Sequence, residues 1–294
     1  MNTLKKPKNS IFIGYLSIPI IIYCFVVIVP IIGALYYSNF SWSGGSKKTF
    51  VGIHNYIKLL QDMTFWKSFL NNLEITIICV IGQIGLALIL ALIINSRFVK
   101  ARNFHLAVSY FPVILSAVVV GYIWSMLYDY NYGLFNTLLK LVGREDLVQP
   151  WLSNSKISLL LVSIPLVWKN IGYYLIIILA GLTSIDKSIL EMAEIDGANA
   201  RQRLHSIILP MLRNTLVVCL TLCISGNMKV FDHIYVMTDG GPGTSTMVMA
   251  LYAYKTSFIR YKMGYGSTLS IGILIVSVGV TLIVRNLALH RKKD

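Results

Sequence analysis

Charge is scarce in this sequence, and negative charge is the scarcest. Charged residues make up 13% of the 294 residues, with 12 acidic against 26 basic side chains, whereas soluble domains average about 25% charged. Hydrophobic residues reach 56%, and the mean hydropathy is +0.69. This composition excludes an ordinary soluble domain and indicates an integral membrane protein. The net charge of +14 does not indicate nucleic-acid binding, because the basic residues flank apolar runs and form no continuous stripe.

The spacings that bind metals or nucleotides are also lacking. The five histidines are scattered, without an H-E-x-x-H motif. Glu191 and Glu194 have no helical Glu-x-x-His partner for a di-iron site. Residues 44–49 lack the G-x-x-x-x-G-K-[ST] spacing of a phosphate loop. We therefore expect no catalytic residue, metal or cofactor in this chain. The four cysteines lie in apolar runs and are interpreted as small core residues: Cys24, Cys79, Cys219 and Cys223.

Six apolar runs are long enough to cross a bilayer of about 30 Å as helices that rise about 1.5 Å per residue. Backbone polar groups in hydrocarbon must be satisfied within the segment, so each run predicts a transmembrane helix. The first run is too long for the core of a signal peptide, and we expect it to be retained. The sequence therefore predicts an all-α integral membrane protein with spans at 11–37, 70–94, 105–127, 157–182, 211–236 and 265–284.

The distribution of Lys and Arg predicts that both termini are cytoplasmic. With the N-terminus inside, the shorter inner segments hold 14 Lys and Arg residues and the longer outer segments hold 10. The remaining two, Lys169 and Lys229, fall within predicted spans. The first outer loop carries the pattern of a short amphipathic helix at 54–61. No repeat or soluble domain interrupts the pattern, which predicts a single membrane domain across 1–294 with a cytoplasmic tail at 1–10 and a basic tail at 286–294.

One polar island interrupts the apolar pattern, at residues 184–210. Four of the chain's 12 acidic residues fall within eleven positions there. Apolar residues recur at helical spacing, which predicts a helix with one apolar face, and Ser184 or Asp186 can cap its start. A glycine then allows a sharp turn. A second helical segment is predicted at 200–208, and Pro210 suits the first turn of the span that follows.

The residues of this island resemble the EAA loop, which marks the permease subunits of binding-protein-dependent ABC importers. The family pattern is roughly E-A-A-x-x-D-G-A, followed by hydrophobic positions and I-x-L-P. This sequence differs at Met192, where the family usually has alanine, but Met is flexible enough to fill a similar groove. In that family the loop is cytoplasmic and sits in a cleft of the ATPase. The resemblance therefore assigns an ATPase-coupling role to Glu191, Ala193, Asp196, Gly197, Ala198, Leu204, Leu209 and Pro210.

A second string, FDHIYVMTDGGPG at 231–243, resembles the carbohydrate-uptake branch of these permeases, the maltose and glycerol-3-phosphate type. The likeness covers most of residues 70–285. It implies the type I ABC-importer permease fold and a cargo of sugars, oligosaccharides or glycerol phosphates, delivered by an extracytoplasmic solute-binding protein. It also implies a second permease chain, related or identical, and a cytoplasmic ATPase dimer that holds ATP and Mg²⁺, in a bacterial cell membrane.

Polar residues around the end of the fifth predicted span are candidates for the cargo path. The glycines and proline at 240–243 cannot continue a helix, so the span must end or unwind there. Lys229 and Asp232 lie three apart just before this point, and ionisable groups in a span usually mark a pathway. Alternatively they form a structural pair, and Lys169 and Asn170 snorkel to the outer interface. The predicted cargo-path residues are Trp168, Asn170, Tyr173, Ser225, Asn227, Lys229, Asp232 and Tyr235.

The sequence thus predicts a non-enzymatic pore subunit of an ATP-driven importer, coupled to a separate ATPase through 184–210. The alternative is an ion-coupled secondary transporter of small polar solutes, with Lys229 and Asp232 as the coupling pair. Such carriers usually show two related halves, and this chain has no convincing internal repeat.

Overall fold

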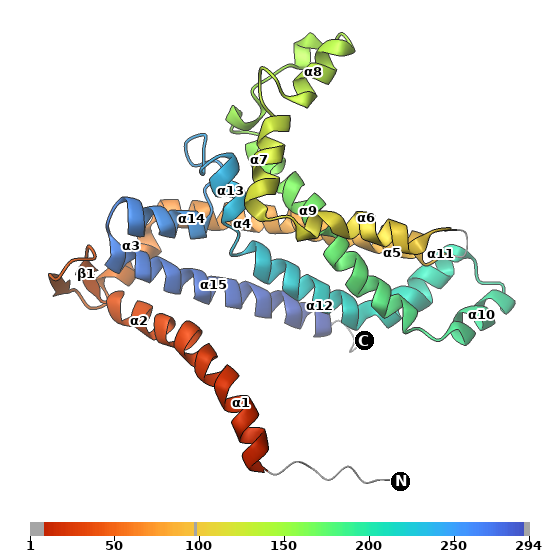
Figure 1. Ribbon diagram of the computed structural model, residues 1–294, viewed down its shortest axis with the longest axis horizontal. Helices are drawn as coiled ribbons and strands as arrows, with labels where there is room; N and C mark the ends of the chain where they lie inside the picture. Colours follow the sequence, from red (N-terminus) through yellow and green to blue (C-terminus); the bar gives the residue numbers. More distant parts are fainter. Residues whose placement is uncertain (1–8, 97–98, 291–294) are drawn as a thin grey trace. The chain divides into compact units, whose positions relative to one another are not determined.

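The computed structural model describes residues 9–96 and 99–290, which form two compact units (Figure 1). Unit 1 combines Met1–Asp62 with Ala253–Leu274, and unit 2 combines Met63–Tyr252 with Ile275–Asp294. The single membrane domain expected across the chain stays a prediction, as does the cytoplasmic orientation of both termini. Residues 1–8 and 291–294, which hold most of the two expected tails, lie outside the described part.

The all-α membrane architecture is confirmed by helix length and composition. Five helices are long and apolar enough to span a membrane, and a bent pair brings the number to six if it counts as one span. The five are Gly14–Tyr37, Met63–Ile94, Ser158–Thr183, Ala200–Asn227 and Met263–Leu289.

Unit 1 holds the first span and a small β-hairpin, and two side chains from elsewhere in the unit form hydrogen bonds with the backbone at the start of the hairpin. Asn55 donates from Nδ2 to the backbone oxygens of Ser38 at 2.8 Å and Phe40 at 3.1 Å, and Thr268 donates from Oγ1 to the Ser38 oxygen at 3.2 Å. The amphipathic helix predicted at 54–61 is confirmed. The elements of unit 1 are α1 (Asn9–Tyr23), η1 (Cys24–Ile28), α2 (Val29–Tyr37), the antiparallel strands β1 (Phe40–Trp42) and β2 (Lys48–Phe50), α3 (His54–Gln61), η6 (Lys255–Ile259) and the start of α15 (Met263–His290).

Unit 2 is built around α9 (Ser158–Thr183), which packs against α4, α5, α6 and α12. Gly172 allows α9 to lie directly on α6, because a Cβ at this position would come within 2.2 Å of the Ser109 backbone oxygen. The remaining elements of unit 2 are α4 (Met63–Cys79), η2 (Val80–Gly85), α5 (Leu86–Ile94), α6 (Arg102–Ile114), α7 (Ala117–Leu127), α8 (Leu134–Leu141), η3 (Glu145–Leu147), η4 (Trp151–Ser153), α10 (Lys187–Ile195), α11 (Ala200–Arg203), η5 (Leu204–Ile208), α12 (Leu209–Asn227), α13 (Asp232–Met237) and α14 (Met249–Tyr254), which continues into unit 1.

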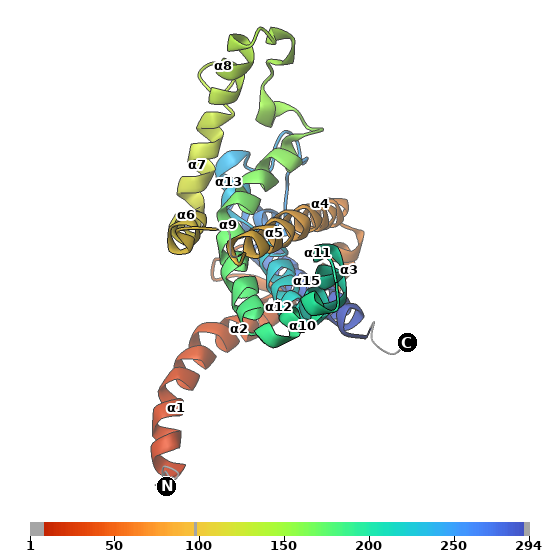
Figure 2. The same ribbon diagram turned by 90° about the vertical axis from the view of Figure 1, so that its right-hand side faces the viewer.

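The span expected as one helix at 105–127 is broken. Helices α6 and α7 meet at 96° (Figure 2), and the two residues between them, Leu115 and Ser116, have extended backbones. The Ser116 hydroxyl accepts a hydrogen bond from the Val119 amide at 3.2 Å and so caps the start of α7. Hydrophobicity alone could not reveal this break, because both halves are apolar.

The span expected at 211–236 is also displaced. Residues Ala200–Asn227 form one continuous helix, so the segment predicted at 200–208 is helical but not separate from the span. Pro210 lies inside this helix and cannot donate a backbone bond to the preceding turn, and the π-helical turn η5 comes directly before it. The helix ends at Asn227 rather than at 236, and α13 begins separately at Asp232.

Candidate functional site

Local hydrogen bonds define the first helix of the predicted coupling loop, α10. Asp186 caps its start by accepting from the Ser188 amide at 3.0 Å, and this bond holds the pKa of Asp186 below its ordinary value. At the other end, Gly197 has φ of +79°, a conformation that costs other residues about 1–2 kcal/mol. The Gly197 amide donates to the Glu194 oxygen at 3.1 Å, and the Ala198 amide donates to the Ala193 oxygen at 2.9 Å. This is a Schellman motif, and it satisfies the last carbonyls of the helix.

The second helix of the loop, α11, begins with a capping box. The Asn199 side chain accepts from the Gln202 amide at 2.9 Å, and the Gln202 side chain accepts from the Asn199 amide at 2.8 Å. Arg203 and Glu194 form an ion pair at 3.2 Å that links α11 to α10. The capping roles of Asn199 and Gln202 were not predicted, although the N-x-x-Q spacing is a known capping signal. The pairing of Arg203 with Glu194 was not predicted either.

The two helices therefore form a folded elbow, and its apolar residues divide between two faces. Ala193 is buried and Ile185 is 7% exposed, so both pack against their own chain. Met192 and Ile195 point outward with exposures of 56% and 85%, next to exposed Glu191. The predicted coupling residues vary in exposure: Glu191, Asp196, Gly197 and Pro210 are exposed, Ala198, Leu204 and Leu209 are half-buried, and Ala193 is buried.

A cavity separates part of the elbow from the spans it joins. It has a volume of about 320 Å³ and lies between the ends of α5 and α9 on one side and α10, α11 and η5 on the other. Arg203, which forms the ion pair with Glu194, lines it together with Leu190 and Ile208. This part of the elbow is therefore not packed tightly against the spans.

A second irregular region follows α12 and includes the glycine-rich string. Two buried asparagine side chains on α4 form hydrogen bonds with backbone groups in and beside this region. Asn72 donates to the Asn227 oxygen at 2.9 Å and accepts from the Met249 amide at 2.9 Å. Asn71 donates to the backbone oxygens of Thr244 at 3.2 Å and Met247 at 2.8 Å. The sequence analysis missed both asparagines, although two adjacent amides in an apolar run are unusual.

Lys229 and Asp232 do not share a helical turn, as their spacing had suggested. The segment between α12 and α13 is not helical, so Lys229 follows one helix and Asp232 begins the next. Both side chains are exposed, and the described residues contain no ion pair between them. The alternative reading of these two as a structural pair is therefore wrong. Both remain available to a cargo or a partner.

Lys169 lies near the middle of α9, and its snorkelling toward the outer interface stays a prediction. Its ammonium donates to the Val113 backbone oxygen at 3.2 Å. Val113 is in the last turn of α6, where the break before α7 removes the helical donors for the final carbonyls. A cation at the C-terminus of a helix also interacts favourably with its dipole. Lys169 therefore stabilises the broken span.

The predicted cargo-path residues on α9 lie on different faces of the helix. Asn170 and Tyr173 are three positions apart and share a face, whereas Trp168 points elsewhere. Asn170 donates to the Leu166 oxygen of its own helix at 2.9 Å. Trp168 is 37% exposed and meets Trp124 of α7 edge to face, with ring centroids 6.1 Å apart. The sequence analysis did not identify Trp124, which only the packing of α7 on α9 brings to this place.

The remaining predicted path residues lie around the α12–α13 junction. Asn227 is buried and donates to the Cys223 oxygen at 2.8 Å, so its amide nitrogen is committed to the fold. Ser225 is half-buried on α12. Tyr235 on α13 is 42% exposed and stacks on Phe231 with ring centroids 5.3 Å apart. The junction therefore offers Lys229, Asp232 and Tyr235 as its exposed polar side chains among those predicted.

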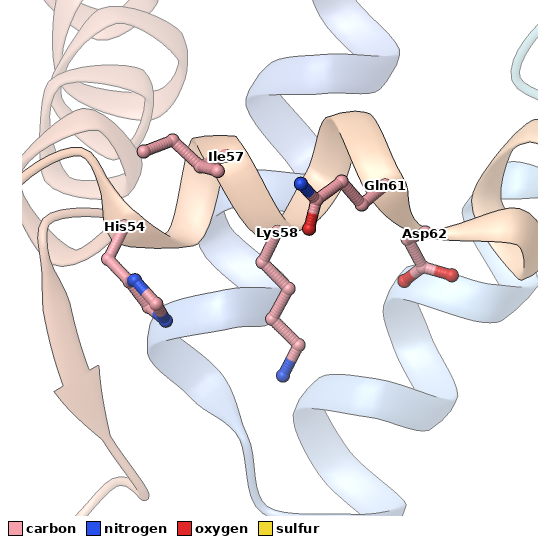
Figure 3. Close-up of a pocket in the computed structure, with 5 residues that line it drawn as sticks. All are labelled: His54, Ile57, Lys58, Gln61 and Asp62. Atoms are coloured by element: carbon pink, nitrogen blue, oxygen red, sulfur yellow. The ribbon is translucent and has the colours of Figure 1, made fainter.

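A separate polar pocket lies in unit 1, along α3. His54, Lys58 and Gln61 line it together with Ile57 and Asp62, around a volume of about 440 Å³ (Figure 3). The Lys58 ammonium lies 4.6 Å from the centroid of the Tyr265 ring, and the Tyr265 hydroxyl donates to Asp62 at 2.6 Å. These contacts join α3 to α15, and none of the residues was predicted to serve the cargo path.

The chain is similar to known permeases along nearly its whole length. The family model described as "Binding-protein-dependent transport system inner membrane component" matches residues 83–293. The trehalose/maltose transport system permease protein MalF of Thermococcus litoralis is 32% identical over 295 residues, which cover 99% of this chain and 98% of the relative. The multiple sugar-binding transport system permease protein MsmF of Streptococcus mutans is 28% identical over 285 residues, covering 96% and 97%.

Solved structures agree on the fold. A chain of a bacterial ABC transporter involved in the import of the acidic polysaccharide alginate matches with a TM-score of 0.84, at 21% identity and 97% coverage of both chains. At that identity the likeness shows the fold alone, and it confirms the predicted permease fold. The family match and the carbohydrate-transport relatives show that the chain is a multi-pass membrane protein of the binding-protein-dependent transport system inner membrane component family, in the branch of carbohydrate-uptake ABC permeases.

Proposed function

We propose that this chain forms part of the translocation pathway of an ATP-driven importer in the bacterial plasma membrane. Its cargo would be a sugar, an oligosaccharide or a glycerol phosphate, delivered by an extracytoplasmic solute-binding protein. The names of several relatives support a carbohydrate cargo. A solved relative is described in complex with an alginate pentasaccharide-bound periplasmic protein, which supports the delivery route.

The exposed face of the elbow is the observation that supports a separate ATPase as the source of energy for transport. Ile195 is 85% exposed and Met192 is 56% exposed, on a helix that is capped at both ends. Large apolar side chains held outward on a rigid helix indicate a surface that a partner covers. Glu191 adds a charged group beside them. We infer that the ATPase binds this face. Helix α11, which continues directly into the span Ala200–Asn227, would then transmit the movement of the ATPase to the span.

This continuity gives the coupling a mechanical basis. A force on α11 acts on the span Ala200–Asn227 without an intervening flexible loop, since α11, η5 and α12 are one helix. The span ends at Asn227, directly before the exposed side chains of Lys229 and Asp232. Movement at the elbow would therefore reach the predicted cargo path through a single helix.

The cargo path itself is proposed to use polar and aromatic groups of α9 and of the α12–α13 junction. Lys229 and Asp232 offer a donor and an acceptor to sugar hydroxyls, and the Trp168–Trp124 pair and Tyr235 offer aromatic faces. A second permease chain, related or identical, would complete the path. This chain would bind no cofactor and carry out no chemistry, and ATP with Mg²⁺ would bind to the ATPase dimer.

The test is uptake of labelled sugar into vesicles that contain the complete transporter, with a photoreactive residue in place of Ile195. We expect uptake to require ATP inside the vesicle and the photoreactive residue to crosslink to the ATPase. The same residue at Leu141, which is 77% exposed on α8, serves as the control and should not crosslink to the ATPase. Uptake that survives ATP depletion but stops when the ion gradient collapses would instead identify an ion-coupled carrier.

A further inference from the structure

A groove in unit 2 lies between α12 and the C-terminal part of α15. Its volume is about 360 Å³, within the range of small-ligand sites. Four apolar side chains form most of its wall, and three polar residues, Asn214, Thr221 and Arg285, also line it. The apolar members are Val217, Val218, Leu222 and Leu289.

Two arginines at this end of the helices differ in what they bind. Arg213 donates from Nη2 to the backbone oxygens of Ala288 at 2.7 Å and Leu289 at 2.8 Å, and so satisfies carbonyls in the last turn of α15. Arg285, one turn earlier on α15, is exposed in the groove, and the described residues offer its guanidinium no hydrogen bond or ion pair. The Asn214 amide in the same groove likewise has no hydrogen bond within the described part of the chain.

An anionic phospholipid matches this combination of groups. Both helices are membrane spans, so hydrocarbon chains are the surroundings that their apolar walls normally meet. A guanidinium binds a phosphate through two parallel hydrogen bonds, and the amide adds a further donor. Basic pockets between transmembrane helices are known sites for acidic headgroups. A protein partner in the groove would instead bury an unpaired arginine, which is costly unless it brings its own carboxylate.

We propose that this groove binds one anionic phospholipid, with the phosphate held by Arg285 and Asn214 and an acyl chain lying along Val218 and Leu222. The site is independent of the cargo path and of the elbow. The bound lipid would hold the end of α15 beside α12, where hydrogen bonds from Arg213 already join the two helices.

The first test measures lipid binding to the full chain by native mass spectrometry. We expect phosphatidylglycerol to bind the wild-type chain and phosphatidylcholine with identical acyl chains to bind much more weakly. Arg285→Ala should weaken phosphatidylglycerol binding by about tenfold or more, because it removes the charged donor that pairs with the phosphate. Arg285→Lys should weaken it less. Lys140→Ala, which removes one positive charge from α8, should leave it unchanged.

Two outcomes would overturn the proposal. Equal binding of the two lipids, or equal binding by wild type and Arg285→Ala, would mean that the groove does not recognise an anionic headgroup. A photoreactive residue in place of Val218, which is 52% exposed, gives the second test in native membranes. We expect it to crosslink to phospholipid, and a crosslink to a second permease chain would assign the groove to a subunit interface instead.

Discussion

The elbow at 184–210 and the irregular region at 227–249 are both places where the chain leaves a long helix, yet the side chains that bond their backbones come from different distances along the sequence. In the elbow, each capping bond joins residues two to five positions apart, as with Asn199 and Gln202. In the region after α12, the partners Asn71 and Asn72 lie more than 150 positions away on α4. The elbow is therefore stabilised by local hydrogen bonds, whereas the region after α12 also depends on hydrogen bonds from a helix that is distant in the sequence.

The difference follows from the surroundings of each segment. A loop in water can leave some polar groups to the solvent and needs only local capping. A segment that interrupts apolar spans must have its amides and carbonyls bonded within the protein. Substitutions in the elbow should therefore disturb coupling without unfolding the chain, whereas substitutions of Asn71 or Asn72 should unfold it.

The largest expected effect is that of Gly197→Pro in the elbow. Proline cannot adopt the φ of +79° and cannot donate to the Glu194 oxygen, so the Schellman motif is lost. We expect uptake to fall by at least about tenfold, because about 1.4 kcal/mol of strain in the docking conformation already has that effect. Copurification of the ATPase should be lost, while membrane insertion is retained.

Gly143→Pro is the matched control for this substitution. Gly143 ends α8 in the same motif, with φ of +72° and with the Arg144 amide donating to the Leu139 oxygen at 2.8 Å. We expect the ATPase to copurify with Gly143→Pro as with wild type. Normal uptake by Gly197→Pro, or loss of the ATPase in both variants, would contradict a specific role of the elbow.

Asn72→Leu should have the largest effect on stability. Asn72 is fully buried, and its loss leaves the Met249 amide without its partner and the Asn227 oxygen with only the 3.3 Å bond from the Val230 amide. Each buried unsatisfied group costs about 1–3 kcal/mol, so we expect a clear fall in the thermal unfolding temperature in detergent. Asn286→Leu, at an exposed position of α15, should unfold close to the wild-type temperature. Equal stability of the two variants would refute the tertiary capping of the α12–α13 region.

Lys169→Met and Lys229→Met should separate structural from transport roles. Lys169 bonds the end of α6, so its loss should destabilise the chain by about 1.5–3 kcal/mol. The Lys229 side chain is exposed and has no hydrogen bond to the described residues, so Lys229→Met should keep the wild-type unfolding temperature but lower sugar uptake. The comparison fails if Lys229→Met is the less stable variant, or if its uptake is unchanged.

The smallest expected effect is a pH dependence at the start of the elbow. The Ser188 amide lowers the pKa of Asp186 in the folded chain, so the cap is at full strength above the ordinary aspartate pKa of about 3.9. It is lost as the pH falls through the lowered folded value. We expect hydrogen exchange of the α10 amides, corrected for the intrinsic rate, to accelerate only at such acid pH. Asp186→Asn keeps the cap without titrating, so an unchanged acid dependence in that variant would exclude Asp186 as its cause.

Much of the fold could be predicted because it rests on composition and local patterns. The apolar runs predicted the spans, the amphipathic pattern predicted α3, and the capping residues predicted α10 and its turn. The predictions failed where a helix breaks without a change in hydrophobicity, as between α6 and α7, and where the segment at 200–208 proved continuous with the following span. The assumed helical pairing of Lys229 with Asp232 was wrong for the same reason, since spacing carries meaning only within a continuous helix. Pro210 does lie in the first turn of α12, as predicted.

The sequence by itself determined the membrane class, the positions of most spans and the shape of the elbow, because hydrophobicity and capping act over a few residues. Only the tertiary structure decided which polar groups are free and which are committed to the fold. The side chains of Lys169, Asn71 and Asn72 are bound to backbone groups of other segments, whereas Lys229, Asp232 and Arg285 are exposed. Such long-range pairing depends on which helices pack together, and no local pattern in the sequence encodes it.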